Sequence, residues 1–328
     1  MTETGPRIAV VGASGVVGRV TLQLLLRRGF TNIRTFASWR TAGEMLGEFE
    51  VEEASAVALG GGDFDICFFS VGADLSAQLV PAAAAAGALC IDKSSAFRLE
   101  EGVPLVVPEV NGERALENTG IVANPNCCAI PLSMVLAPIH DAAGLRNVRI
   151  ATYQSVSGAG TEAIEDLRGE SPDQHRLRMD WDFDGVEFDE EVKLREETRK
   201  ILELPDLPIS ATCVRVPVII GHAQAVWLET VEPLRVRAAQ QLLSEAQGLR
   251  FEEVPKPAMA IGVDDVVVGR VREDSGVENG LVLFLVCDNI LKGAALNAVQ
   301  IVELIMGASA PAQRVESIAG YRLHFGRS

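Results

Sequence analysis

A glycine-rich loop near the start of the chain limits its possible folds more than any other feature. Residues 7–11 (RIAVV) have the composition of a buried strand, and Gly12, Gly15 and Gly18 follow them before an apolar helical segment. Glycines permit a close approach of the backbone to a phosphate, and the N-terminus of the next helix attracts a pyrophosphate. The spacing G-x-x-G-x-x-G differs slightly from the usual dinucleotide fingerprint, but its place between a strand and a helix predicts a nucleotide site rather than a plain turn. We expect cofactor contacts from Gly12, Ala13, Ser14, Gly15, Val16 and Val17.

The end of the next predicted strand, residues 32–38, indicates which nucleotide binds. An NAD site usually places an acidic side chain there to bind the ribose 2′-hydroxyl. This chain has Ser38, Trp39, Arg40 and Thr41 instead. A guanidinium without a neighbouring carboxylate suits a 2′-phosphate. We therefore expect NADP (NADPH) bound by Ser38, Arg40 and Thr41, the alternative being an Arg40 that is merely solvated.

Strands and helices alternate through the rest of the first half. Residues 65–71 (DICFFSV) are typical of a buried strand, residues 74–86 of an alanine-rich helix, and strand-like runs continue to GIVAN at 120–124. This alternation predicts an α/β fold with a doubly wound, mostly parallel sheet of the Rossmann type. We assign it to residues 1–126 as the NADP-binding domain.

Long strand-like runs dominate the second half. They include ISATCVRVPVII, QAVWLETV, VDDVVVGRV and GLVLFLVC, which together predict an open mixed sheet. A length of 328 residues suits two domains. We assign residues 127–290 to the second domain and expect a C-terminal helix within 291–328 to pack back on the first.

Composition excludes several classes of partner and site. The net charge of −16 disfavours nucleic acid, whose phosphates select clusters of Lys and Arg. No apolar run is long enough for a membrane span, and the N-terminus lacks the pattern of a signal peptide, so we expect a cytoplasmic protein that binds no membrane. The only close cysteines are directly adjacent and the four histidines are scattered, so we expect no metal site. The other four cysteines, Cys67, Cys90, Cys213 and Cys287, lie in apolar runs and are expected to be buried.

The adjacent pair, Cys127 and Cys128, follows an Asn-Pro-Asn turn and precedes a predicted helix. Helix N-terminal N–H groups favour a thiolate at Cys127. Successive helical residues differ in direction by about 100°, so the two thiols are not expected to reach the same substrate atom. Cys128 begins the apolar run CAIPLSMVL and is expected to pack in the core.

Motifs along nearly the whole chain resemble the aspartate-semialdehyde dehydrogenases. They are GASGVVG near the N-terminus, SSAFR at 94–98, NPNC at 124–127, YQSVSGAG at 153–160, EEVK at 190–193, RVPVIIGH at 215–222 and DNILKGAALNAVQ at 288–300. The resemblance implies a catalytic and dimerisation domain like that of glyceraldehyde-3-phosphate dehydrogenase, and a homodimer or a dimer of dimers. It also implies NADPH-dependent reductive dephosphorylation of L-aspartyl-4-phosphate to L-aspartate-4-semialdehyde, a step toward lysine, methionine and threonine.

The same resemblance implies roles for individual residues. Cys127 becomes the nucleophile, His222 the acid and base, and Gln154 the group that orients the intermediate. Substrate binding falls to Arg98, Asn126, Glu190, Lys193 and Arg215, of which Arg215 meets the carboxylate, Glu190 the amino group, and Arg98 and Lys193 the phosphate. Further cofactor contacts fall to Ser157, Gly158 and Gln300. One segment departs from the family pattern: the acidic stretch 179–189 (MDWDFDGVEFD) stands where relatives often have asparagine and proline.

Two other functions remain as alternatives. An N-acetyl-glutamyl-phosphate reductase uses the same chemistry, but its acetylated nitrogen is neutral and gains no salt bridge from Glu190. A catalytically silent NADP-binding paralogue would have no need for Cys127, Gln154, Arg215 and His222 together. Taken singly, Arg98, Glu190 and Lys193 also suit solvated or surface ion pairs, and Gln154 and His222 suit structural hydrogen bonds.

Overall fold

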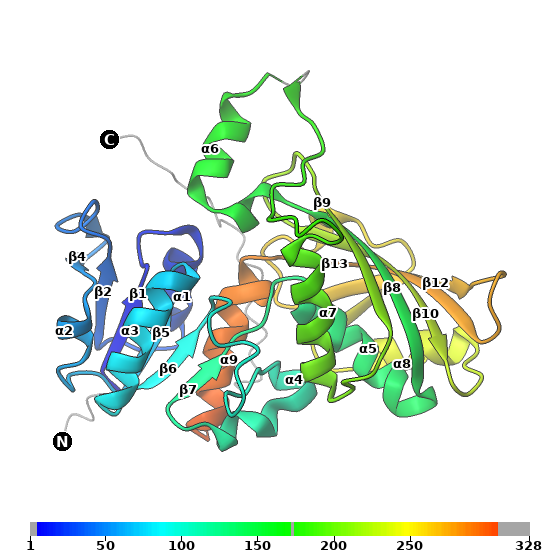
Figure 1. Cartoon of the computed structure of the whole chain (residues 1–328), viewed down its shortest axis with the longest axis horizontal. Coiled ribbons are helices and arrows are strands. Elements are labelled where there is room, and N and C mark those ends of the chain that lie inside the picture. The colour runs from blue at the N-terminus through cyan, green and yellow to red at the C-terminus, as the bar shows by residue number, and fades with distance from the viewer. Residues whose placement is uncertain (1–4, 172–173, 308–328) are drawn as a thin grey trace.

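Two β-sheets of different type organise the protein (Figure 1). The structure is a computed structural model, and it describes residues 5–171 and 174–307. Over these residues the first sheet has seven strands and the second has six. The prediction of an α/β chain with a Rossmann-type sheet followed by a mixed sheet is confirmed.

The first sheet has the strand order β3-β4-β2-β1-β5-β6-β7 and is parallel except for the pairing of β3 with β4. Its strands are β1 (Ile8–Val11), β2 (Ile33–Ala37), β3 (Met45–Leu46), β4 (Phe49–Glu53), β5 (Ile66–Phe69), β6 (Leu89–Asp92) and β7 (Ile121–Ala123). Side chains alternate across β1: Ile8 and Val10 enter one core, and Ala9 and Val11 enter another. Both faces are therefore buried, which explains the continuous apolar strands.

Helices cover both faces of this sheet. One face carries α1 (Val16–Arg27) and α9 (Leu296–Ile305), which pack together, and the other carries α2 (Ala56–Leu59) and α3 (Ala73–Ala85). A π-helical turn, η5 (Leu291–Ala295), leads into α9 and also packs on α1. The short α4 (Pro108–Asn111) and η1 (Gly112–Glu117) lie beside α9. The predicted C-terminal helix spans 291–305, whereas residues 308–328 lie outside the described residues; the domain boundaries stay predictions.

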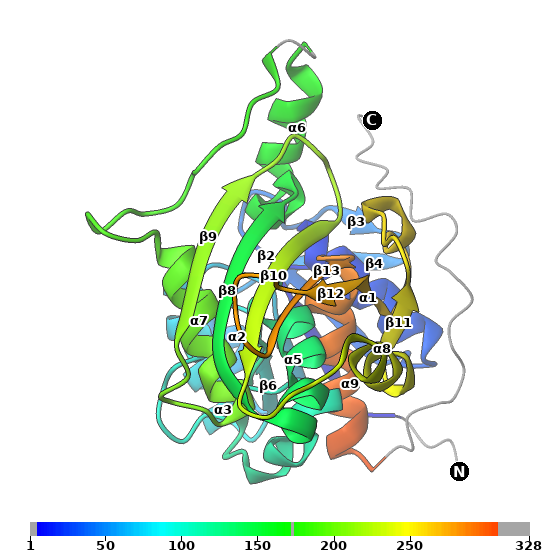
Figure 2. The same cartoon turned by 90° about the vertical axis from the view of Figure 1, so that its right-hand side faces the viewer.

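The second sheet is mixed, with the order β11-β12-β13-β10-β8-β9. Its strands are β8 (Leu145–Gln154), β9 (Ile209–Arg215), β10 (His222–Thr230), β11 (Leu249–Glu252), β12 (Val266–Glu273) and β13 (Gly280–Cys287). One face packs on the three helices α5 (Ala129–Ala143), α7 (Asp189–Leu202) and α8 (Val236–Glu245). Figure 2 shows β8, β9 and β10 in front of α5 and α7, with no described helix over the face turned to the viewer. The connections include η2 (Val156–Ala159), α6 (Thr161–Gly169) and η4 (Pro257–Met259).

Strand register brings polar residues to one end of the second sheet. Gln154 and Arg215 are the last residues of β8 and β9 and are paired partners in the parallel ladder. His222, the first residue of β10, pairs with Cys287, the last residue of β13. These strand ends therefore gather side chains that lie far apart in the sequence. Within the described ranges, no helix has the length and apolarity to cross a membrane.

Candidate active site

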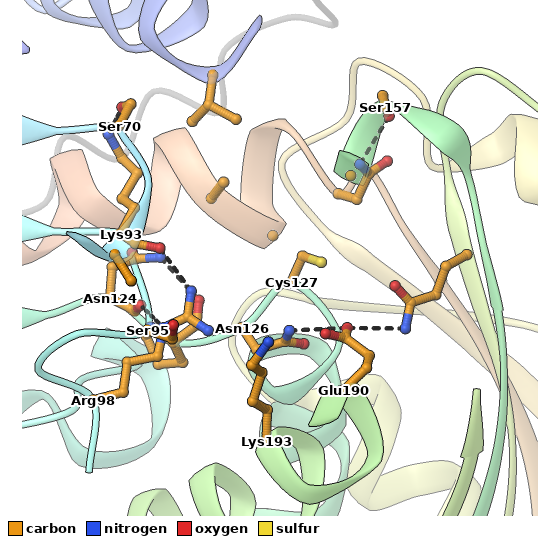
Figure 3. A pocket seen from close by; sticks show the side chains of 18 of the residues that line it. Ser70, Lys93, Ser95, Arg98, Asn124, Asn126, Cys127, Ser157, Glu190 and Lys193 are labelled. Carbon is orange, nitrogen blue, oxygen red and sulfur yellow. Dashed lines mark hydrogen bonds between the residues drawn. The ribbon is translucent and has the colours of Figure 1, made fainter. Parts of the chain in front are cut away.

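A cavity of about 390 Å³ lies where the loops after β5, β6 and β7 face the ends of β8 and β9 (Figure 3). Ten of the predicted site residues line it: Val17, Arg98, Asn126, Cys127, Gln154, Ser157, Gly158, Glu190, Lys193 and Arg215. Both sheets contribute to its wall, so the cavity joins the glycine loop to the NPNC turn.

Cys127 lies at the turn between β7 and α5. The side-chain Oδ1 of Asn126 accepts a hydrogen bond from the backbone N–H of Cys128 at 2.7 Å, which fixes the turn. Cys128 is the N-cap of α5, so Cys127 precedes the helix. Of the two cysteines, Cys127 lines the cavity (Figure 3), and Cys128 is fully buried in the apolar core.

The two thiols have opposite pKa shifts. A hydrogen bond from the Cys128 thiol holds the pKa of Cys127 well below its usual value against the effect of burial, and the nearby His222 ring and the charge of Arg98 lower it further. Burial, followed by the thiolate beside it, raises the pKa of Cys128 well above its usual value. The arrangement therefore favours ionisation of Cys127 over that of Cys128.

His222 lies close to Cys127 and is fully buried. Its Nδ1 accepts the backbone N–H of Ser155 at 3.0 Å. Within the described residues its Nε2 has no hydrogen-bond partner, and a ring nitrogen lies within 4.8 Å of the sulfurs of Cys127 and Cys128. Because a backbone donor occupies Nδ1, we assign the ring proton to Nε2.

Glu190 is held between two other predicted residues. Its Oε1 accepts hydrogen bonds from Asn126 Nδ2 and Gln154 Nε2, both at 3.0 Å. Burial, and then the charge of Cys127, raise the pKa of Glu190 despite these two amide donors. A buried carboxylate in a cavity can bind a cation, so its position is compatible with the role predicted for Glu190.

Arg98 and Lys193 line the same cavity and already have partners. Arg98 donates to the carbonyl oxygens of Asn124 and Lys93 and forms an ion pair with Glu197 at 2.9 Å. Lys193 forms an ion pair with Asp189 one turn earlier on α7. The sequence did not single out Glu197, although it shares a face of α7 with Glu190 and Lys193 at helical spacing.

Arg215 is buried and contacts the acidic stretch 179–189. Its Nη1 donates to the carbonyl oxygen of Ser155 at 3.2 Å, and its Nη2 forms an ion pair with Asp180 at 3.1 Å. The guanidinium lies 4.5 Å from the ring centroid of Trp181. A carboxylate of the chain itself thus occupies one edge of the guanidinium predicted to bind the substrate carboxylate.

The glycine loop has the close backbone contacts that its sequence predicts. Gly12 has a φ of 82°, and a Cβ there would lie 2.3 Å from the carbonyl oxygen of Ser70. A Cβ on Gly18 would lie 2.0 Å from the carbonyl oxygen of Gly12, so these positions admit only glycine. Ser70 lines the cavity, which connects the loop to the site of Cys127.

The residues after β2 lie beside this loop. The hydroxyls of Ser14 and Thr41 are 3.2 Å apart. Arg40 is exposed, stacks on Trp39 with its guanidinium 5.7 Å from the ring centroid, and forms no ion pair with any described residue. Arg40 is thus unpaired within the described residues, and its neighbour Thr41 contacts the loop.

Lys93 was missed by the sequence analysis and lines the cavity. Its Nζ donates to the hydroxyls of Ser70 at 2.8 Å and Thr21 at 3.1 Å, and burial lowers its pKa to about 7. Its place directly after β6, at the carboxyl edge of a parallel sheet, was the available signal.

Two other expectations have a different outcome in the structure. Gln300 does not line the cavity; its side chain bonds Lys292 at 2.8 Å and Glu109 at 3.1 Å, so its cofactor role remains a prediction without a supporting contact. The expectation of no metal site rested on scattered histidines, yet the fold gathers Cys127, Cys128 and His222 into one group of potential ligands.

Comparison with known proteins gives a consistent result. Residues 7–118 match the family model "Semialdehyde dehydrogenase, NAD binding domain", and residues 136–181 and 179–292 match "Semialdehyde dehydrogenase, dimerisation domain". The aspartate-semialdehyde dehydrogenase of Streptomyces akiyoshiensis is 42% identical over 91% of this chain and 98% of that protein. The Aquifex aeolicus enzyme of the same name is 40% identical over 92% and 98%. The crystal structure of aspartate semialdehyde dehydrogenase II from Vibrio cholerae in complex with ASA is similar, with a TM-score of 0.85 and 36% identity over 93% of this chain and 99% of that one.

Proposed function

This chain belongs to the aspartate-semialdehyde dehydrogenase family, and from that premise we propose that it converts L-aspartyl-4-phosphate to L-aspartate-4-semialdehyde reversibly through a thioester at Cys127. The reaction serves lysine, methionine and threonine biosynthesis. The single observation that carries the proposal is the sulfur of Cys127 close to the ring of His222, in a cavity that reaches the glycine loop.

Cys127 performs the covalent step. An acyl phosphate accepts hydride poorly, so the thiolate first attacks the acyl carbon and releases phosphate, which leaves a thioester. NADPH, when bound, supplies the hydride for the reduction. The semialdehyde then leaves as the C–S bond breaks and Cys127 is again a thiolate.

His222 acts as the acid and base for the tetrahedral species. A ring nitrogen of His222 lies within 4.8 Å of the sulfur of Cys127, and its Nε2–H, which has no partner among the described residues, donates a hydrogen bond to the oxygen that becomes negative in each tetrahedral species. The hydrogen bond from Ser155 to Nδ1 orients the ring. Gln154 and Asn126, both bonded to Glu190, form the adjacent wall and orient the acyl group.

Charged side chains of the cavity match the substrate. Glu190 binds the α-ammonium, Arg215 the α-carboxylate, and Arg98 and Lys193 the phosphate. This assignment requires Arg215 to exchange Asp180 for the substrate, which is reasonable because Asp180 is 39% exposed. A buried Glu190 also argues against an N-acetylated substrate, whose nitrogen offers no positive charge.

We assign the cofactor as NADP rather than NAD. Arg40 is exposed and unpaired among the described residues, and no acidic side chain stands at positions 38–41. The hydroxyls of Ser14 and Thr41 lie together at the loop and add hydrogen-bond donors for a 2′-phosphate. The close packing of Gly12 and Gly18 fits a pyrophosphate against the start of α1.

We propose that the protein forms a homodimer and that its subunits meet through the face of the second sheet that no described helix covers. The match to a dimerisation domain over residues 136–292 includes all six of its strands. Side chains pointing to this face include Arg149, Ala151, Tyr153, Ser210, Thr212 and Trp227. Tyr153 is 40% exposed, and an aromatic side chain on an open sheet face is typical of a subunit contact.

The test is whether the purified protein reduces NADP in the presence of L-aspartate-4-semialdehyde and phosphate. The reaction is monitored by the absorbance of NADPH. We expect turnover that depends on phosphate and disappears in Cys127→Ser, with NADP binding retained in the variant. An absence of turnover in the wild-type protein despite measurable NADP binding would favour the silent-paralogue alternative.

A further inference from the structure

We propose that Cys127, Cys128 and His222 form a binding site for a soft divalent cation such as Zn²⁺, and that the bound cation blocks the nucleophile reversibly. The sulfurs and a ring nitrogen lie within 4.8 Å of one another. Thiolate and imidazole are the ligands that Zn²⁺ prefers. Cys128, which the proposed reaction does not use as a nucleophile, supplies the second sulfur ligand of this site.

The spacing suits a metal after small side-chain movements. With Zn–S bonds of about 2.3 Å, two sulfurs on a tetrahedral zinc are roughly 3.8 Å apart. The remaining distance has to be closed by rotation about the side-chain bonds of Cys127 and Cys128. Cys127 lines the cavity, which provides an entry path and leaves the fourth coordination position to solvent.

His222 supplies the third ligand, but its coordination requires a change of tautomer and the loss of one hydrogen bond. Its Nε2 is buried and has no partner among the described residues. Metal binding there requires the ring proton to move to Nδ1, where the hydroxyl of Ser155 lies 3.1 Å away. That hydroxyl already donates to Asn289 Oδ1 at 3.0 Å, so it is free to accept. Because the backbone N–H of Ser155 then loses its acceptor, the two sulfurs contribute more to affinity than the imidazole does.

A disulfide between the two cysteines is the competing use of the pair, and covalent geometry disfavours it. Adjacent Cα atoms across a trans peptide are about 3.8 Å apart, whereas disulfides usually need roughly 4.4–6.8 Å. The chain has no cis peptide bond among its described residues. The pair therefore remains as two thiols, which a cation can bridge without this restraint.

Binding of the cation and catalysis exclude each other because both use the sulfur of Cys127. Zn²⁺ displaces the proton of the Cys128 thiol into solvent, and the two thiolates then neutralise the charge of the cation inside a buried site. Zn²⁺ should therefore inhibit in competition with the semialdehyde, protect Cys127 from alkylation, and be removed by a chelator with full recovery.

The experiment measures Zn²⁺ affinity on the cofactor-free full-length protein by competition with a chromogenic chelator, so its result does not depend on enzymatic activity. We expect one Zn²⁺ per chain, and a Kd that rises at least about tenfold in Cys128→Ser, the loss that even outer-shell changes can cause. Cys128→Ala is measured in parallel in case the hydroxyl disturbs folding. His222→Gln should weaken binding less than either Cys128 substitution.

Cys213→Ser is the matched control, because Cys213 is also fully buried in the second sheet and lies outside the ligand group. It should leave the Kd unchanged. Cd²⁺ supplies an independent readout, since its thiolate charge-transfer absorbance should fall in Cys128→Ser and persist in Cys213→Ser. Equal Zn²⁺ affinity in the wild type and both folded Cys128 variants would overturn the proposal, as would equal losses in Cys213→Ser.

Discussion

Replacement of Glu190 by glutamine tests how the cavity selects its substrate. The carboxylate is 6% exposed and is held by Asn126 and Gln154, so glutamine keeps its size and position but loses its charge. The α-ammonium then exchanges a charged partner for a neutral one. Hydrogen bonds to charged groups contribute about 1.5–3 kcal/mol, and each 1.4 kcal/mol is about tenfold. We expect kcat/KM for aspartate semialdehyde to fall about 10- to 100-fold.

The assay compares aspartate semialdehyde with succinate semialdehyde, which has the same carbon chain without the amino group. The wild type should prefer the amino substrate, and Glu190→Gln should lose most of that preference while its kcat/KM for succinate semialdehyde changes little. The pKa of Glu190 is raised, so the carboxylate becomes neutral as pH falls through a value above the ordinary glutamate range. The preference should therefore decline on the acid side in the wild type and be independent of pH in the variant.

Glu191→Gln is the matched control. Glu191 is the next residue and is also buried, but it accepts the backbone N–H groups of Cys213 at 2.9 Å and Phe188 at 2.9 Å. Its substitution should lower thermal stability and leave the substrate preference intact. Equal losses on both semialdehydes in Glu190→Gln would refute the reasoning, because Glu190 would then serve only to position Asn126 and Gln154.

Three further predictions concern the cofactor, Arg215 and the thiol pair. Arg40→Asp should raise KM for NADP about tenfold or more through loss of a charge-assisted contact and change KM for NAD little; equal changes would remove Arg40 from the 2′-phosphate site. Asp180→Asn should lower KM for the semialdehyde by up to about fivefold, the range of a partly exposed ion pair, because it frees Arg215; a higher KM would mean that Asp180 orients the guanidinium. Cys128→Ala should raise the pH midpoint of Cys127 labelling by iodoacetamide by about one unit, whereas Cys128→Ser keeps a donor and the low midpoint; identical midpoints would contradict the hydrogen bond.

Local signals in the sequence were sufficient for the sheet types and for the loops that precede helices. Gly18 is constrained by the carbonyl oxygen of Gly12 within the loop itself, so the glycine spacing was informative, whereas the contact of Gly12 with Ser70 after β5 was not visible in it. The NPNC turn is likewise local, since Asn126 bonds Cys128 two residues later. Such contacts leave a pattern in consecutive residues.

Contacts between distant segments left no comparable pattern. The pairing of Arg215 with Asp180 and of Arg98 with Glu197 depends on how α7 and the acidic stretch fold over the second sheet. Lys93 is found only through its place at the edge of the first sheet.

The adjacent cysteines show a different reason for an incomplete prediction. A turn of about 100° per residue applies inside a helix, but Cys127 precedes α5 and Cys128 is its N-cap. The core position of Cys128 followed from its apolar neighbours, whereas the closeness of the two sulfurs did not.

The most direct test of the account is to find the acyl group on Cys127. Without phosphate, the protein mixed with NADP and aspartate semialdehyde should form at most one NADPH per active site, because the thioester has no phosphate to receive the acyl group. Acid quenching and peptide mass spectrometry should then locate an aspartyl adduct on Cys127, and addition of phosphate before quenching should remove it. An adduct on Cys128, or phosphate-dependent turnover that survives Cys127→Ser, would contradict the central claim.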